Sequence, residues 1–131
     1  MFEVSVTDTF DAAHQLQYAG GQPEPLHRHN WRVTVTYAGD VLDETGVLLD
    51  FVALRARLKA VVAPLNGWSL HELPQFASGN PSGELVACFV GAQLAAELPG
   101  AARLACVAVE EEPGCIARYV PPHDGARVPC G

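Results

Sequence analysis

Three of the five histidines in this 131-residue chain, His14, His27 and His29, lie within a stretch of sixteen residues. His27 and His29 are two positions apart and lead into a segment in which apolar and polar residues alternate. Because successive side chains of a β-strand point to opposite faces of the sheet, these two imidazoles would share one face. Together with His14 they could bind zinc and leave its fourth position open for water or a substrate. Without further context, three unrelated surface or core histidines would be the simpler interpretation.

The segments that carry these histidines are predicted to be β-strands. Residues 2–9 alternate between apolar and polar, and the same parity continues loosely to His14. A second strand is predicted over residues 26–38, with His27 and His29 at its start and apolar residues further along the same face. The candidate metal ligands therefore lie at one end of a strand pair whose shared face becomes apolar.

Two helices are predicted in the middle of the chain. Asp50 is suited to be the N-cap of a helix over residues 51–62. Asn80 is suited to be the N-cap of a second helix, with Pro81 in its first position, and Pro99-Gly100 would end it.

Residues 104–111 and 115–120 are predicted to pair as a hairpin across a Pro113-Gly114 turn. The order ββααββ favours an α+β fold, in which two helices cover one face of an antiparallel sheet. No internal repeat or linker is present in the sequence, so residues 1–131 are predicted to form a single domain.

Composition restricts the class of partner. The net charge is −7, with only 8 lysine and arginine residues, which argues against binding of nucleic acid or of acidic membranes. The sequence contains no apolar run of the roughly 20 residues that span a bilayer, and residues 1–4 do not resemble a signal peptide. We therefore expect a cytoplasmic protein with a small-molecule substrate.

Five segments, in the right order, resemble the 6-pyruvoyltetrahydropterin synthase and 6-carboxytetrahydropterin synthase family. The resemblance covers nearly the whole chain, and each segment matches one of the family's motifs. The segments are Phe10-Asp11-Ala12-Ala13-His14-Gln15-Leu16, Leu26-His27-Arg28-His29-Asn30-Trp31, Gly46-Val47-Leu48-Leu49-Asp50-Phe51, Asn80-Pro81-Ser82-Gly83-Glu84 and Val107 to Glu111.

The resemblance implies the tunnelling fold (T-fold), with a four-stranded antiparallel sheet and two helices on one face. It also implies a homo-oligomer, a trimer or a hexamer of paired trimers. The family's zinc ligands correspond to His14, His27 and His29. Its pterin-holding glutamate corresponds to Glu111, although Glu110 is one position away, and its helix-start contacts correspond to Ser82 and Glu84.

Three of these residues also have simpler interpretations. Glu111 could be an ordinary strand-end carboxylate, but three adjacent acids repel one another unless one has a partner, which favours a ligand for one of them. Ser82 could be only a helix-start residue, and Glu84 could only stabilise the dipole of the first helical turn.

The departures from the family concern its acid–base residues. The family's catalytic cysteine, a few residues before the H-G-H motif, is absent from residues 21–26, and Asn66 and Gly67 occupy the places of its Asp-His pair. Arg28 replaces the glycine between the zinc histidines and would add positive charge beside the site.

Two residues could supply the missing base. Glu24 resembles the replacement found in a branch of the family that uses glutamate instead of cysteine and cleaves the pterin side chain in an aldolase-like step; it could equally be a solvated loop carboxylate. His71 with Glu72 could perform acid–base chemistry, or could be an ordinary surface pair, which is the simpler interpretation.

The leading hypothesis is therefore a zinc-dependent lyase acting on the side chain of a dihydropterin similar to dihydroneopterin triphosphate. A second is a diverged zinc enzyme that performs an aldol, retro-aldol or cyclisation step on a non-pterin small molecule in a specialised biosynthetic pathway. A third is a non-catalytic ligand-binding paralogue that keeps the metal.

Overall fold

The computed structural model describes residues 1–18, 20–77, 79–95 and 102–122. Within these ranges, four strands form one antiparallel sheet in the order β1-β2-β3-β4. The strands are β1 (Phe2–His14), β2 (His27–Gly39), β3 (Arg103–Glu112) and β4 (Cys115–Tyr119). The helices are α1 (Phe51–Val62) and α2 (Gly83–Leu94), with short 3-10 turns η1 (Ala63–Leu65), η2 (Leu70–Glu72) and η3 (Pro74–Phe76) between them.

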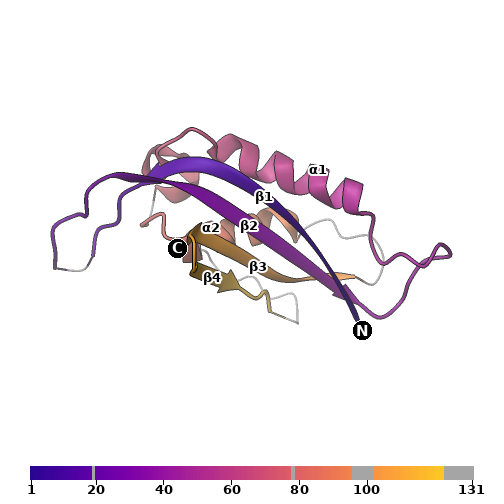
Figure 1. Ribbon diagram of the computed structural model, residues 1–131. Helices are drawn as coiled ribbons and strands as arrows, with labels where there is room; N and C mark the ends of the chain where they lie inside the picture. The colour runs from indigo at the N-terminus through magenta and orange to yellow at the C-terminus, as the bar shows by residue number, and fades with distance from the viewer. Residues whose placement is uncertain (19, 78, 96–101, 123–131) are drawn as a thin grey trace.

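Both helices lie on the same face of the sheet, α1 against β1 and α2 against β3 and β4 (Figure 1). The predicted α+β fold and the ββααββ order are thus confirmed. No helix within the described ranges combines the length and the apolar composition that crossing a membrane requires.

Strand β1 continues to His14 because β2 pairs with it over its whole length. The register places Val6 opposite Val35 and His14 opposite His27. Val6, Phe10 and Ala12 on this inner face are buried, whereas Ser5 and Thr7 on the other face are exposed. The alternation in the sequence therefore correctly predicts which side chains of the two strands share a face.

Trp31 lies under the end of the sheet that carries the histidines. Its side chain is 0% exposed, and its Nε1–H donates to the carbonyl oxygen of Ala12 at 3.0 Å. The indole stacks on Phe10 with a centroid distance of 5.7 Å. It also makes edge contacts with the rings of His14 and His29, at 4.9 and 5.7 Å. Trp31 is thus part of the hydrophobic core and also contacts the rings of two histidines, so packing of the core helps to position these rings.

The two helices differ in how well their starts are predicted. Asp50 is the N-cap of α1, as expected, and accepts a hydrogen bond from the Val52 N–H at 2.9 Å. The predicted N-cap of α2 is wrong: Ser82, not Asn80, accepts the hydrogen bond of the Leu85 N–H, at 3.2 Å. The expected end of this helix at Pro99-Gly100 lies outside the described residues.

Asn80 instead joins the start of α2 to the end of β1. Its Oδ1 accepts from the Gln17 N–H at 2.8 Å, and its Nδ2 donates to the Gln17 carbonyl at 2.7 Å. A carboxamide offers a donor and an acceptor together, so it can satisfy both polar groups of a residue that has left the strand ladder.

We predict that Trp31→Phe lowers the free energy of unfolding by about 2–3 kcal/mol, because it removes a buried hydrogen bond and leaves a small void. Urea denaturation followed by far-UV circular dichroism would measure the change. Trp68→Phe is the matched control, because the Trp68 side chain is 51% exposed, and it should change stability little. Equal losses in the two variants would contradict the role assigned to Trp31.

Candidate metal centre and substrate cavity

The three histidines meet at the end of the β1–β2 ladder. His14 and His27 are direct cross-strand partners, and His29 lies opposite Ala12. The Nε2 atoms of His14 and His27 are 2.8 Å apart. One nitrogen from each of the three rings belongs to a group whose atoms all lie within 4.8 Å of one another. The strand register alone therefore brings the side chains predicted as ligands into metal-binding distance.

Backbone carbonyls determine which nitrogen of two rings faces inward. His14 Nδ1 lies 2.8 Å from the carbonyl oxygen of Pro81, and His27 Nδ1 lies 2.9 Å from that of Pro25. Because a carbonyl can only accept, each Nδ1 carries a proton, and Nε2 is the nitrogen of each ring that is left to bind a metal. This is the arrangement in which histidine ligands of metals are usually held.

The inward-facing nitrogens form a group that suits a cation. Two lone pairs at 2.8 Å repel each other unless a proton or a cation lies between them. His29 Nε2 is buried and has no hydrogen-bond partner among the described residues. Burial lowers the pKa of His29 below its ordinary value, although the nearby Glu111 carboxylate opposes this effect. Neutral imidazoles with converging lone pairs fit a divalent cation.

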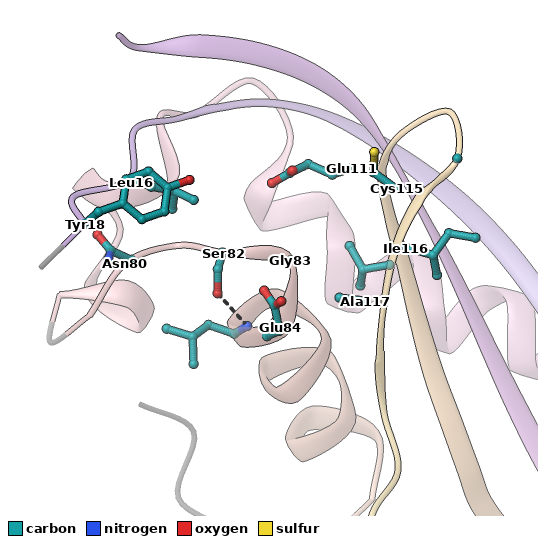
Figure 2. Close-up of a pocket in the computed structure, with 13 residues that line it drawn as sticks. Leu16, Tyr18, Asn80, Ser82, Gly83, Glu84, Glu111, Cys115, Ile116 and Ala117 are labelled. Carbon is teal, nitrogen blue, oxygen red and sulfur yellow. Dashed lines mark hydrogen bonds between the residues drawn. The ribbon is translucent and has the colours of Figure 1, made fainter. Parts of the chain in front are cut away.

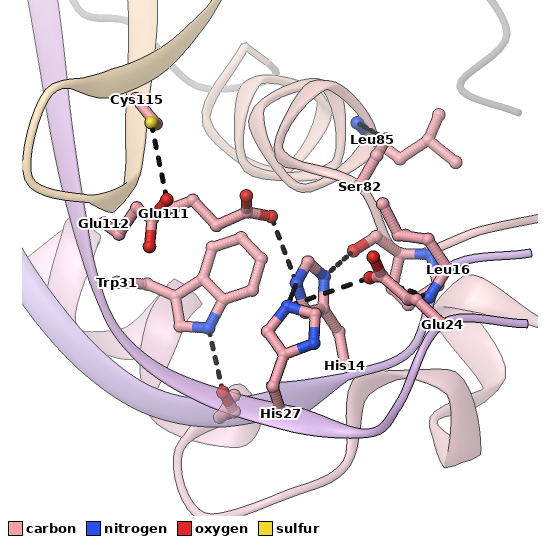
Figure 3. A network of polar contacts seen from close by, with 12 residues as sticks. His14, Leu16, Glu24, His27, Trp31, Ser82, Leu85, Glu111, Glu112 and Cys115 are labelled. Atoms are coloured by element: carbon pink, nitrogen blue, oxygen red, sulfur yellow. Dashed lines mark hydrogen bonds and ion pairs between the residues drawn. The ribbon is translucent and has the colours of Figure 1, made fainter.

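Glu111 reaches this group from β3, and strand alternation explains why Glu110 does not. The β2–β3 ladder places Val33 opposite Val109, on the histidine face, so Glu111 shares that face. Its Oε1 lies 3.2 Å from His14 Nε2 (Figure 3). The Glu110 carboxylate instead accepts from the Gly114 N–H in the turn, at 3.3 Å. Of the two acids that the sequence left open, Glu111 is the one beside the histidines.

A cavity of about 790 Å³ opens next to Glu111, between the start of α2, the β3–β4 hairpin and the segment that follows β1 (Figure 2). Ser82 and Glu84, at the start of α2, are among the residues that line it. The complete lining consists of Leu16, Tyr18, Asn80, Ser82, Gly83, Glu84, Leu85, Val109, Glu111, Gly114, Cys115, Ile116 and Ala117.

Glu24 is held in place beside the histidines. Its backbone N–H donates to the Leu16 carbonyl at 2.9 Å, and its own carbonyl accepts from Gln15 Nε2 at 2.8 Å. Its Oε1 accepts from the Leu16 N–H at 3.2 Å and lies 3.7 Å from His27 Nε2. With 25% of its side chain exposed, Glu24 is not a freely solvated loop carboxylate. Figure 3 shows Glu24 and Glu111 approaching His14 and His27 from two sides.

The structure does not bring His71 into this group. His71 lies in η2 and is exposed, and it is neither in the histidine cluster nor among the residues that line the cavity. Asn66 and Gly67 have structural contacts: Asn66 Oδ1 accepts from the Asp11 N–H at 2.9 Å, and the Gly67 N–H donates to the Asp11 carbonyl at 2.6 Å. Gly67 has a φ of 84°, a conformation that favours glycine.

Arg28 does not place its charge beside the histidines. It pairs with Ala13 across the ladder, so its side chain lies on the opposite face of the sheet from His27 and His29. Its Nη1 forms a salt bridge with Asp11 Oδ1 at 3.0 Å. The expectation of a positive charge next to the candidate metal ligands is therefore wrong, because alternate strand residues point to opposite faces.

Cys115 is a cavity residue that the sequence did not indicate. It lies at the start of β4, far in sequence from the histidines, and the β3–β4 hairpin brings it to the cavity wall. Its thiol lies 3.6 Å from Glu112 Oε1, and the hydrogen bond to this carboxylate raises the pKa of the thiol. A protonated thiol is a poor nucleophile, which argues against Cys115 as a replacement for the cysteine missing from residues 21–26.

Comparisons with known proteins agree on one family. The family model for 6-pyruvoyl tetrahydropterin synthase matches residues 3–122. The chain is 34% identical to 6-carboxy-5,6,7,8-tetrahydropterin synthase of Synechocystis sp. over 119 residues, 87% of this chain and 89% of that protein. It is 28% identical to dihydroneopterin monophosphate aldolase of Pyrococcus furiosus over 96 residues, 73% of this chain and 77% of that protein.

Solved structures share the fold. The 6-pyruvoyl tetrahydropterin synthase of Caenorhabditis elegans superimposes with a TM-score of 0.80 at 21% identity, over 92% of this chain and 96% of that one. A Plasmodium vivax 6-pyruvoyltetrahydropterin synthase, solved with a catalytic glutamate replaced by alanine, gives a TM-score of 0.72 at 19% identity, over 90% and 96% of the two chains. The four-stranded sheet with two helices is thus the T-fold of these enzymes.

We predict that the purified protein retains about one divalent metal ion per chain and that His29→Ala loses it, because each of three neutral imidazoles donates one lone pair. Inductively coupled plasma mass spectrometry after dialysis would measure the metal content. His71→Ala is the matched control and should keep the metal. Unchanged metal content in His29→Ala would contradict a three-histidine site.

Proposed function

Because the chain belongs to the 6-pyruvoyl tetrahydropterin synthase family, we propose that it is a zinc-dependent lyase acting on the side chain of a dihydropterin. The observation that supports this most directly is the arrangement of His14, His27 and His29 beside a cavity that also contains Glu111. The relatives at 34% and 28% identity are both named as pterin enzymes, which favours a pterin over an unrelated small molecule.

The ligand set favours zinc among divalent metals. All three donors are imidazole nitrogens, which suit zinc, whereas magnesium and calcium prefer oxygen ligands. A zinc ion with an open position would polarise a substrate oxygen and make the neighbouring proton more acidic. The carbonyls of Pro81 and Pro25 would keep the two ring nitrogens of His14 and His27 directed at the ion.

Glu111 is proposed to hold the pterin ring. Its carboxylate is 27% exposed and lies at the boundary between the histidines and the cavity. Two carboxylate oxygens can accept from the paired N–H groups on the guanidine-like edge of a pterin. Binding the ring there would leave the side chain directed toward the histidines, and Ser82 and Glu84 would contact the ring or its substituent from the start of α2.

Glu24 is proposed as the general base. A base must lie within hydrogen-bond reach of the proton that it removes, and Glu24 Oε1 is already 3.7 Å from His27 Nε2. Glu24 lies in the loop that lacks the family's cysteine. The catalytic residue replaced in the Plasmodium vivax structure is also a glutamate. The aldolase name of the Pyrococcus furiosus relative is consistent with carboxylate-assisted cleavage of a pterin side chain. The role of His71 stays a prediction.

We also propose that the enzyme is a cytoplasmic homo-oligomer, a trimer or a hexamer. Within the described residues β1 pairs on one side only, with β2, except for a short bridge at Ala13. A strand of 13 residues with an open edge is a ready partner for a strand of another copy.

We predict that Glu24→Gln lowers kcat by about 10²-fold or more, because removal of a general base typically costs 10²–10⁴-fold. Zinc-loaded protein would be incubated with a panel of dihydropterins, and the products would be followed by mass spectrometry. Glu44→Gln, at an exposed position outside the cavity lining, is the control, and His71→Ala tests the second candidate. Full activity in Glu24→Gln would exclude Glu24 as the base; absence of turnover with every dihydropterin would favour a non-catalytic binding protein.

We predict that Glu111→Gln weakens binding of the pterin ring at least about tenfold, because it removes a charge-assisted pair of hydrogen bonds. Fluorescence titration with neopterin would give the dissociation constant. Glu110→Gln is a control of the same chemistry at the adjacent position, and its carboxylate lies in the β3–β4 turn. A larger effect at Glu110 than at Glu111 would reverse the assignment.

A further inference from the structure

Glu24, the base in the proposed function, lies in the loop that leaves the sheet after His14 and returns to it at His27. Loops are usually more mobile than the helices and strands that they connect. A general base, however, must lie within hydrogen-bond reach of the proton that it removes, and a misplacement of about 1 Å can cost about 100-fold in rate. Contacts that hold this loop in one conformation are therefore expected to affect the rate of the reaction.

Backbone pairing between the two arms of the loop is short. The Glu24 N–H donates to the Leu16 carbonyl at 2.9 Å, and an isolated antiparallel bridge joins Gln17 to Pro23. Pro23 and Pro25 lie on either side of Glu24, and proline has no N–H to donate. Because a regular ladder cannot continue along this arm, side chains must supply further contacts.

The Gln15 side chain supplies such a contact at Glu24 itself. Its Nε2–H donates to the Glu24 carbonyl oxygen at 2.8 Å, in a partly buried position. The Leu16 N–H donates to Glu24 Oε1 at 3.2 Å, so Gln15 and Leu16 together hold both the main chain and the carboxylate of Glu24. A carboxylate can accept several hydrogen bonds, so the contact with Leu16 leaves it able to accept a proton.

Gln15 itself lies between two fixed points of the backbone. His14, before it, is paired with His27 in the β1–β2 ladder. Gln17, after it, is held by Asn80, which bonds both the N–H and the carbonyl of Gln17, at 2.8 and 2.7 Å. All of these contacts join residues of one chain, so none of them requires a second copy. The Gln15 amide therefore extends from a fixed backbone toward the opposite arm of the loop.

Resting on the proposed function, we propose that Gln15 is a positioning residue for the reaction, whose amide holds the Glu24 main chain so that the carboxylate stays beside the histidines. Gln15 is neither in the histidine group nor among the residues that line the cavity. Its effect on turnover is therefore expected to pass through Glu24, whose Oε1 lies 3.7 Å from His27 Nε2. The simpler alternative is that Gln15 only stabilises the fold, and the two roles predict different results.

The substitution Gln15→Met keeps a side chain of similar length and removes the amide donor. We expect kcat to fall about tenfold or more, measured on zinc-loaded protein with the dihydropterin that the wild-type protein turns over fastest. The dissociation constant for neopterin and the metal content should not change. Gln17→Met is the matched control, because the Gln17 side chain is exposed and the contacts of Gln17 with Asn80 involve only its backbone. Equal kcat values in the two variants would overturn the inference.

A double-mutant cycle with Glu24→Gln tests whether Gln15 acts through Glu24. We expect Gln15→Met to cause no further loss of activity once Glu24→Gln has removed the base. An undiminished loss in the Glu24→Gln background would overturn the inference and leave the proposed function standing. Full activity of Glu24→Gln, or no turnover by the wild-type protein, would overturn the proposed base and this role together.

Hydrogen–deuterium exchange followed by mass spectrometry gives a readout that does not depend on turnover. Amide protection reports local opening, and the N–H groups of Leu16 and Glu24 both take part in the contacts of the loop. We expect both to exchange several-fold faster in Gln15→Met than in the wild-type protein, and at the wild-type rate in Gln17→Met. Unchanged protection in Gln15→Met would show that Gln15 does not hold the loop and would overturn the inference.

Discussion

The candidate site depends on one constraint, which is that nitrogen atoms of three imidazole rings lie close together. The Nε2 atoms of His14 and His27 lie 2.8 Å apart, and His29 has a buried nitrogen without a partner among the described residues. Neutral acceptors in this arrangement are unfavourable alone and become favourable around a cation. The β1–β2 register, the Trp31 indole and the carbonyls of two prolines all contribute to holding them there.

Around this centre, the residues at the places that the resemblance assigns to acid–base chemistry differ from the family's pattern. Asn66 and Gly67, which stand where the family has its Asp-His pair, serve as backbone contacts that attach the segment after α1 to Asp11. The loop before His27 lacks a cysteine but holds Glu24 through three hydrogen bonds to Gln15 and Leu16. The fold is thus that of the family, and three histidines form a group that could hold a metal ion, whereas the proposed base is a different side chain.

The two faces of the sheet also differ in the charged residues that they carry. The inner face carries the histidines, the apolar core and Glu111, and the outer face carries Arg28, Arg32 and Arg118. A strand places neighbours on opposite faces, so residues that adjoin in sequence can serve unrelated purposes. Arg28 lies between two metal-ligand candidates in sequence, yet its salt bridge is with Asp11 on the far side.

The sequence by itself determined the order of the elements, the parity of the strands and the identity of the three histidines, because these depend on local alternation and on short motifs. Only the tertiary structure decided between Glu110 and Glu111, since that choice depends on which face of β3 meets His14. The same holds for Ser82 as the cap of α2, for the fixed position of Glu24 and for Cys115 on the cavity wall. Each of these depends on contacts between segments that are separated in the chain, and spacing along the sequence does not specify such contacts.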